Sequence, residues 1–250
     1  MGVKKGLSKD CFESLLQTKH SRGMNRRMEI INIKEKLFKA STTLPFNYYD
    51  LIFRFMNKDT MSILDVGCGK GFTMKIIKKR FRRKRIFTVG VDQFAPYLRY
   101  CMKEMTHDIL INTNIESLPF KDKSFDVILC LEVIEHLKKE DALRIIENLR
   151  KLARKQVIIS TPVGVCHQEE IDNNPCQRHE SSWNPEEFKK LGFKVRGSGL
   201  RRLYLKQGHF TSGFIRNLAF SLSYVFPLAY FFPKLAFQMV CVYSCNKNDN

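Results

Sequence analysis

The 250-residue sequence has few cysteines, few acidic residues and no long uninterrupted apolar run. Its eight cysteines are too sparse and too irregularly spaced for a disulfide scaffold. Several lie inside apolar runs, where a free thiol behaves as a small hydrophobic side chain, so we expect a reducing compartment. No apolar stretch follows the first lysines, and position 6 is Gly6 rather than Ser or Thr. We therefore expect neither a secretory signal nor N-myristoylation, and a cytoplasmic protein.

The stretch from Asn217 to Pro233 lacks charged residues and is rich in Phe, Leu, Tyr and Ala. Pro227 and Pro233 interrupt it, and the part before the first proline is too short to span a bilayer. We expect a chain that at most touches a membrane surface.

Acidic residues are scarce: 43 Lys and Arg face 25 Asp and Glu, which gives a net charge of +18. The densest basic run extends from Lys75 to Arg85 and suits an anionic membrane or a nucleic acid. A solvated basic face is the simpler interpretation. The run lies at the end of a helix, far from the glycine-rich turn at the start of that helix, where we expect a ligand to bind. A second basic segment comprises Lys189, Lys190, Lys194, Arg196, Arg201 and Arg202. No aromatic-rich RNA-binding module accompanies either segment.

Apolar periodicity divides the chain into residues 1–60, a basic extension with amphipathic helices, and a domain over residues 61–250. In the domain, short apolar runs alternate with amphipathic helices, which indicates a doubly wound α/β fold with a parallel sheet covered on both faces. Strands are expected at 61–67, 85–92, 108–114, 125–131, 156–162, 193–199 and 237–244.

The last two expected strands enclose an apolar insertion, residues 209–234, which we interpret as a helical, partly exposed lid over the acceptor side. Ordinary packing of these aromatics over the sheet is an equally good interpretation. Before it, a polar loop runs from Gly164 to Trp183. Asn184 and Glu187 then form a capping-box pattern that predicts a helix start.

A glycine-rich turn, Asp65-Val66-Gly67-Cys68-Gly69-Lys70-Gly71, follows the first strand and opens a helix. Its glycines allow close approach of a ligand, and Asp92 at the end of the next strand can accept hydrogen bonds from a ribose diol. Phe72 breaks the dinucleotide pattern, and the P-loop pattern is absent. An acid two residues before the first glycine suits a ligand with a cationic amino group, such as the methionine tail of S-adenosylmethionine.

The motifs LDVGCGKG, VGVD, NIESLPF, SFDVILCLEVIEHL, VIISTPVG and HESSWNPEEFKKLGFKV resemble, in this order, the class I S-adenosylmethionine-dependent methyltransferases. The resemblance implies a seven-stranded Rossmann-like sheet with an antiparallel last strand. It also implies cofactor contacts: the methionine moiety at the glycine-rich turn, the ribose at Asp92, the adenine at Asn114 and Ile115, and the methionine amino group near Leu131. The residues expected to bind the cofactor are Asp65, Gly67, Cys68, Gly69, Gly71, Asp92, Gln93, Asn114, Ile115 and Leu131.

Glu132, Glu135 and His136 follow the fourth strand and His179 follows the fifth, where the methyl acceptor should lie. We take Glu135, His136 and His179 as candidate catalytic residues for a small or lipid- or glycan-linked acceptor. A similar order of residues binds a divalent metal in small-RNA ribose methyltransferases. Because related chains carry this motif without metal, we expect no obligatory metal site. A non-catalytic cofactor-binding adaptor is the remaining alternative.

Overall fold

The computed structural model describes residues 45–200 and 227–245, and divides the chain into the units Met1–Leu44 and Pro45–Asn250. The first unit, which comprises most of the predicted basic extension, lies outside the described residues. So does the larger part of the apolar insertion, residues 209–226.

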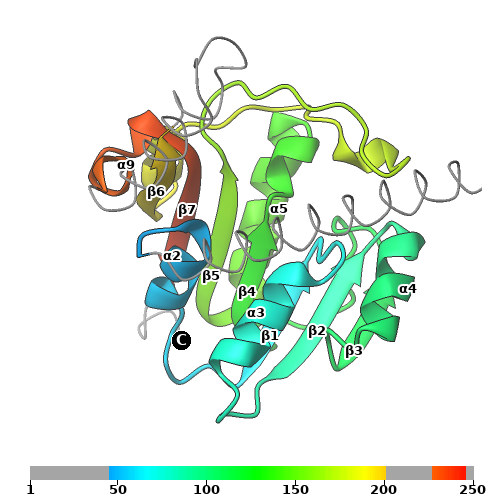
Figure 1. The fold of residues 1–250 in the computed structure, drawn as a ribbon. Coiled ribbons are helices and arrows are strands. Elements are labelled where there is room, and N and C mark those ends of the chain that lie inside the picture. The colour runs from blue at the N-terminus through cyan, green and yellow to red at the C-terminus, as the bar shows by residue number, and fades with distance from the viewer. Residues whose placement is uncertain (1–44, 201–226, 246–250) are drawn as a thin grey trace, which may run out of the picture. The chain divides into compact units, whose positions relative to one another are not determined.

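The second unit contains a seven-stranded sheet of order β3-β2-β1-β4-β5-β7-β6 (Figure 1). β7 pairs antiparallel with β5 and β6, and the other pairings are parallel. The predicted doubly wound α/β sheet with an antiparallel last strand is thereby confirmed. The strands are β1 Ser62–Val66, β2 Phe87–Asp92, β3 Ile109–Asn112, β4 Phe125–Leu131, β5 Ala153–Pro162, β6 Lys194–Leu200 and β7 Ala236–Ser244.

Helices cover both faces of the sheet because alternate strand residues are buried on opposite sides. One apolar cluster joins the sheet to α5 (Lys139–Leu152) and α6 (Pro185–Lys190). The other joins it to α2 (Tyr48–Phe55) and α3 (Phe72–Arg80). α4 (Ala95–Lys103) packs near β3, and the predicted capping box of Asn184 and Glu187 starts α6.

Helix α2 corrects the predicted boundary at residue 60. Leu51 and Ile52 are fully buried in the core cluster that contains strand residues, so this helix belongs to the sheet domain. The sequence analysis places this helix in the basic extension because both have an amphipathic pattern. The apolar face of a helix does not reveal from sequence alone what covers it.

The C-terminal part of the insertion forms α9 (Leu228–Phe231) and η3 (Pro233–Leu235), which contact β6. Ala229 is buried, whereas Phe231 and Phe232 are 66% and 60% exposed. Within the described part of the chain, no helix is long and apolar enough to cross a membrane.

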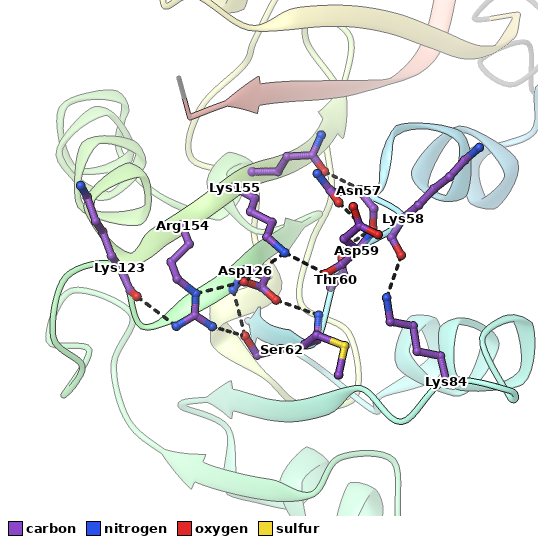
Figure 2. A network of polar contacts seen from close by, with 12 residues as sticks. Asn57, Lys58, Asp59, Thr60, Ser62, Lys84, Lys123, Asp126, Arg154 and Lys155 are labelled. Atoms are coloured by element: carbon purple, nitrogen blue, oxygen red, sulfur yellow. Dashed lines mark hydrogen bonds and ion pairs between the residues drawn. The ribbon is translucent and has the colours of Figure 1, made fainter. Parts of the chain in front are cut away.

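A polar network joins the amino ends of β1, β4 and β5 (Figure 2). Asp126 accepts from the Met61 amide at 2.7 Å and from Arg154 Nε at 3.0 Å. Arg154 also donates to Ser62 Oγ at 2.9 Å, and Lys155 Nζ lies 3.5 Å from Asp126. Burial opposes ionisation of Asp126, but the Met61 amide and Arg154 outweigh it and lower its pKa below the usual value. This network closes the amino end of the sheet.

Candidate active site

The glycine-rich turn connects β1 to α3 through three left-handed glycines. Gly67, Gly69 and Gly71 have φ angles of 67°, 54° and 67°. A Cβ at Gly67 would lie 2.5 Å from Val133 Cγ2, whereas one at Gly69 would meet open space. No side chain among the described residues caps the α3 N-terminus. The turn therefore offers a close, uncapped backbone surface to an anionic or polar ligand.

Asp92 ties this turn to the end of β2. Its Oδ2 accepts from the Gly69 amide and its Oδ1 from the Phe94 amide, both at 2.8 Å. Burial raises the pKa of Asp92, although these two amide hydrogen bonds oppose the shift. Each carboxylate oxygen keeps a lone pair for a ligand hydroxyl.

A pocket opens between the glycine-rich turn and the segment after β4. Five of the predicted cofactor residues line it: Gly67, Gly69, Asp92, Gln93 and Ile115. The other pocket residues are Glu132, Val133, His136, Leu137, Asn174, Cys176 and Gln177. The pocket therefore unites the expected cofactor side and the expected acceptor side.

The remaining predicted cofactor residues do not line this pocket. Gly71 is the N-cap of α3, and the Asn114 side chain accepts from the Glu116 amide. Leu131 packs against the apolar cluster beneath α2 and α3. Asp65 and Cys68 belong to a buried network described next.

Asp65 is buried and partnered by a histidine that the sequence analysis did not single out. His107 Nε2 lies 3.1 Å from Asp65 Oδ2, and its Nδ1 lies 2.8 Å from Thr106 Oγ1. Burial alone would lower the pKa of His107, but Asp65 and Cys101 raise it to about 9. Interaction with Cys68 lowers the pKa of Cys101, which also donates to the Gly69 carbonyl at 3.2 Å. This network supports the turn from beneath.

Glu132 stands at the end of β4 in a left-handed conformation, with φ 56°. Ser160 Oγ donates to its carboxylate at 2.7 Å and lies 2.9 Å from the Tyr48 hydroxyl of α2. Burial raises the pKa of Glu132, although the Ser160 hydrogen bond opposes this. Such backbone strain at a half-buried acid that lines a pocket is typical of functional sites.

Glu135 is 2% exposed, and neither of its carboxylate oxygens has a hydrogen-bond partner among the described residues. Burial, and then the charge of Glu132, raise its pKa well above the usual value. A buried carboxyl without a partner is costly, so its presence points to a functional role.

His136 and His179 lie beside Glu135, with ring centroids 4.9 Å apart. Their Nδ1 atoms lie 3.1 Å from the Arg178 carbonyl and 2.5 Å from the Cys166 carbonyl. Because a carbonyl only accepts, each neutral ring donates through Nδ1 and keeps its lone pair on Nε2. One donor atom from each of Glu135, His136 and His179 lies within 4.8 Å of the others. The structure thus brings the three predicted catalytic residues together.

The loop after β5 supplies pocket residues that the sequence analysis missed. Asn174, Cys176 and Gln177 reach the pocket from η2 (Pro175–Gln177) and the residue before it. Asp172 accepts from Lys70 Nζ at 2.6 Å and from the Tyr97 hydroxyl at 3.0 Å. These contacts tie the loop to the glycine-rich turn and α4. These residues lie in an irregular loop, whose sequence has no helix or strand periodicity, so the sequence could not predict that they reach the pocket.

Comparison with known proteins agrees with this geometry. Residues 64–160 match the family model described as a methyltransferase domain. An uncharacterized protein of Methanocaldococcus jannaschii is 32% identical over 146 residues, 58% of this chain and 60% of that protein. A tRNA U34 carboxymethyltransferase of Campylobacter curvus is 29% identical over 112 residues, 42% of this chain and 35% of that protein. The chain thus matches less than two thirds of the length of either relative.

Among solved structures, a SAM-dependent methyltransferase from Archaeoglobus fulgidus has the same fold, with a TM-score of 0.52 at 19% identity. The alignment covers 84% of this chain and 94% of that one. The sheet order is that of a Rossmann-like fold, which this chain shares with the Archaeoglobus fulgidus structure, and the pocket lies at the carboxyl ends of its strands. The match to the methyltransferase-domain model extends over residues 64–160, less than half of the chain.

Proposed function

We propose that this chain transfers the methyl group of S-adenosylmethionine to a nucleophile of a small or lipophilic acceptor. The observation that carries this proposal is a pocket lined by the glycine-rich turn, Asp92 and His136, with Glu135 and His179 next to His136. When bound, the cofactor supplies a methyl group already activated by its sulfonium. The protein must then mainly bind the cofactor and the acceptor, orient them for transfer, and accept a proton from the acceptor.

On the cofactor side, Gly69 leaves open space and Asp92 keeps lone pairs for the ribose hydroxyls. Gln93 and Ile115 line the same part of the pocket. The proposed binding residues are therefore those that face the pocket. Asp65 and Cys68 act from beneath by fixing the turn.

On the acceptor side, His136 is the proposed proton acceptor, because it lines the pocket and keeps its lone pair on Nε2. Burial lowers the pKa of His136, which keeps the ring neutral and able to accept a proton near neutral pH. Glu135 and His179 lie within 4.8 Å of His136, and the neighbouring His179 also favours the neutral form of the His136 ring.

Aromatic side chains support a lipophilic acceptor. Tyr49 of α2 lies 6.4 Å from Phe72, centroid to centroid, and Phe72 is 48% exposed. The Tyr48 hydroxyl on the same helix joins the Ser160–Glu132 pair. Phe46 also contacts Tyr230 of α9, beside the exposed Phe231. Through α2, these contacts connect Glu132 at the pocket with the exposed aromatic side chains of α9.

The test is transfer of a radioactive methyl group from S-adenosylmethionine to separate lipid, small-molecule and RNA fractions. We expect label in the lipid or small-molecule fraction. His136→Gln should lower the rate about 10²–10⁴-fold with unchanged affinity for S-adenosylhomocysteine. Label confined to RNA would reject the proposed acceptor class, and the absence of S-adenosylhomocysteine binding would reject the whole assignment.

A second candidate is metal-assisted methylation of an RNA ribose hydroxyl. Both imidazoles are oriented by backbone carbonyls with Nε2 available, and Glu135 is an unpartnered carboxyl, as a divalent metal site requires. Similarity to the Campylobacter curvus relative, named as a tRNA-modifying enzyme, also favours an RNA acceptor. Activity on RNA that chelation abolishes and manganese restores would establish this candidate over the first.

A further inference from the structure

Three metal-ligating side chains lie together beneath the glycine-rich turn, apart from the cluster that faces the pocket. Cys68 belongs to the turn, Cys101 to α4, and His107 precedes β3. One donor atom from each lies within 4.8 Å of the other two, and all three residues are buried. None of them lines the pocket. The proposed methyl transfer leaves this cluster without a chemical role.

The histidine is already oriented as a ligand. Its Nε2 lies 3.1 Å from Asp65 Oδ2, and because a carboxylate only accepts, Nε2 donates to Asp65. Nδ1 lies 2.8 Å from Thr106 Oγ1, which a bound metal ion would displace as the partner of this nitrogen. One ring nitrogen of His107 lies within 4.8 Å of the sulfur atoms of Cys68 and Cys101. A carboxylate behind a ligating imidazole is the usual arrangement at zinc.

A fourth donor is present in the same turn. The Gly69 carbonyl oxygen lies 3.2 Å from Cys101 Sγ and 3.9 Å from Cys68 Sγ. In a tetrahedral zinc site, bond lengths of about 2.0–2.3 Å place neighbouring ligand atoms about 3.3–3.8 Å apart. The two sulfur-to-carbonyl separations bracket this range, and the three side-chain donor atoms lie within 4.8 Å of one another.

We propose that Cys68, Cys101 and His107 bind one zinc ion, with the Gly69 carbonyl as fourth ligand. Two thiols and an imidazole are soft donors that select zinc over magnesium or calcium. Binding replaces both thiol protons, so two protons are released for each ion bound. The three side chains are buried and do not line the pocket described above, which suits a structural ion. It would fix the glycine-rich turn to α4 and to the segment before β3.

The experiment measures zinc in the whole protein purified with zinc and a thiol reductant. We expect one zinc per chain in the wild type, and loss of the ion in Cys68→Ser and Cys101→Ser. Cys241→Ala is the matched control, since this cysteine is also buried but lies in β7, and it should keep the ion. His136→Gln should also keep it, which separates this site from the pocket cluster.

Substitution of the wild-type protein with cobalt provides a measurement that needs no variant to fold. Coordination by two thiolates should give an intense thiolate-to-cobalt charge-transfer absorption. Absence of both zinc and this absorption would overturn the proposal, and so would retention of zinc in folded Cys68→Ser. A Cys68–Cys101 disulfide formed in place of metal binding, detected by mass spectrometry, would also overturn it. Binding of S-adenosylhomocysteine is measured separately and tests the proposed function instead.

Discussion

Two buried acids at opposite ends of the sheet differ in their hydrogen bonding. At the amino end, Asp126 is paired with Met61, Arg154 and Lys155 (Figure 2). At the carboxyl end, Glu135 is equally buried but has no hydrogen-bond partner among the described residues. Satisfied charges stabilise a fold, whereas an unsatisfied buried carboxyl costs stability and is kept for its chemistry. The comparison supports the proposal that the functional site lies at the carboxyl end, without use of any motif.

The largest effect is expected at Asp92. Asp92→Ala removes the carboxylate that we propose accepts both ribose hydrogen bonds, and it releases the Gly69 amide, so affinity for S-adenosylhomocysteine should fall by about 2–4 kcal/mol. This corresponds to a loss of about 30- to 1,000-fold, at 1.4 kcal/mol for each factor of ten. Isothermal titration calorimetry measures it. A loss below about threefold would show that Asp92 only holds the turn.

Asp126→Asn tests the opposite end. It removes a charge that Arg154 and Lys155 pair, so the free energy of unfolding at neutral pH should fall by about 1–2 kcal/mol, after allowance for the exposure of Arg154. The pKa of Asp126 is lowered in the folded state, so its contribution is present above the unfolded pKa. It disappears as the pH falls through the folded value. Urea unfolding at several pH values measures this, and unchanged cofactor affinity is the control.

Glu135→Gln should raise the free energy of unfolding, whereas Asp126→Asn should lower it. Because the pKa of Glu135 is raised in the folded state, the wild type loses stability as the pH rises above the unfolded value. The amide removes this penalty, so we expect the variant to gain about 1 kcal/mol at neutral pH and nothing below the unfolded pKa. Stability curves against pH for the two proteins decide the point. A destabilised variant would mean that the carboxylate has a stabilising partner, and the contrast between the two ends would weaken.

The smallest effect on stability is expected at the exposed aromatics of α9. Combined Phe231→Ser and Phe232→Ser should change the free energy of unfolding by less than about 0.5 kcal/mol, because both side chains are mostly exposed. Binding to the lipophilic acceptor or to vesicles should fall, with cofactor affinity unchanged. Loss of both folding and cofactor binding would identify these residues as ordinary core.

Much of the fold could be predicted from sequence because strand and helix periodicities depend on local alternation. The seven strands, the capping box at Asn184 and the turn at Gly67 follow from such local signals. The packing of α2 against the sheet could not be predicted, because the apolar face of a helix does not indicate which strands it contacts.

For the candidate site too, local sequence signals predicted some residues but not others. Asp92 at the end of β2 and His136 in the segment after β4 reach the pocket as expected. Asp65, near the carboxyl end of β1, instead contacts His107, a residue 42 positions away that no sequence spacing indicates. Asn174 and Cys176 enter through an irregular loop, whose path depends on the ion pair of Asp172 with Lys70.

The most direct test is calorimetric titration of S-adenosylhomocysteine into the wild type, Asp92→Ala and Asp126→Asn. We predict one binding site per chain in the wild type, the same affinity in Asp126→Asn and a loss of at least 30-fold in Asp92→Ala. No binding heat with folded wild-type protein, or equal loss in both variants, would contradict the conclusion that the carboxyl end of the sheet holds the cofactor.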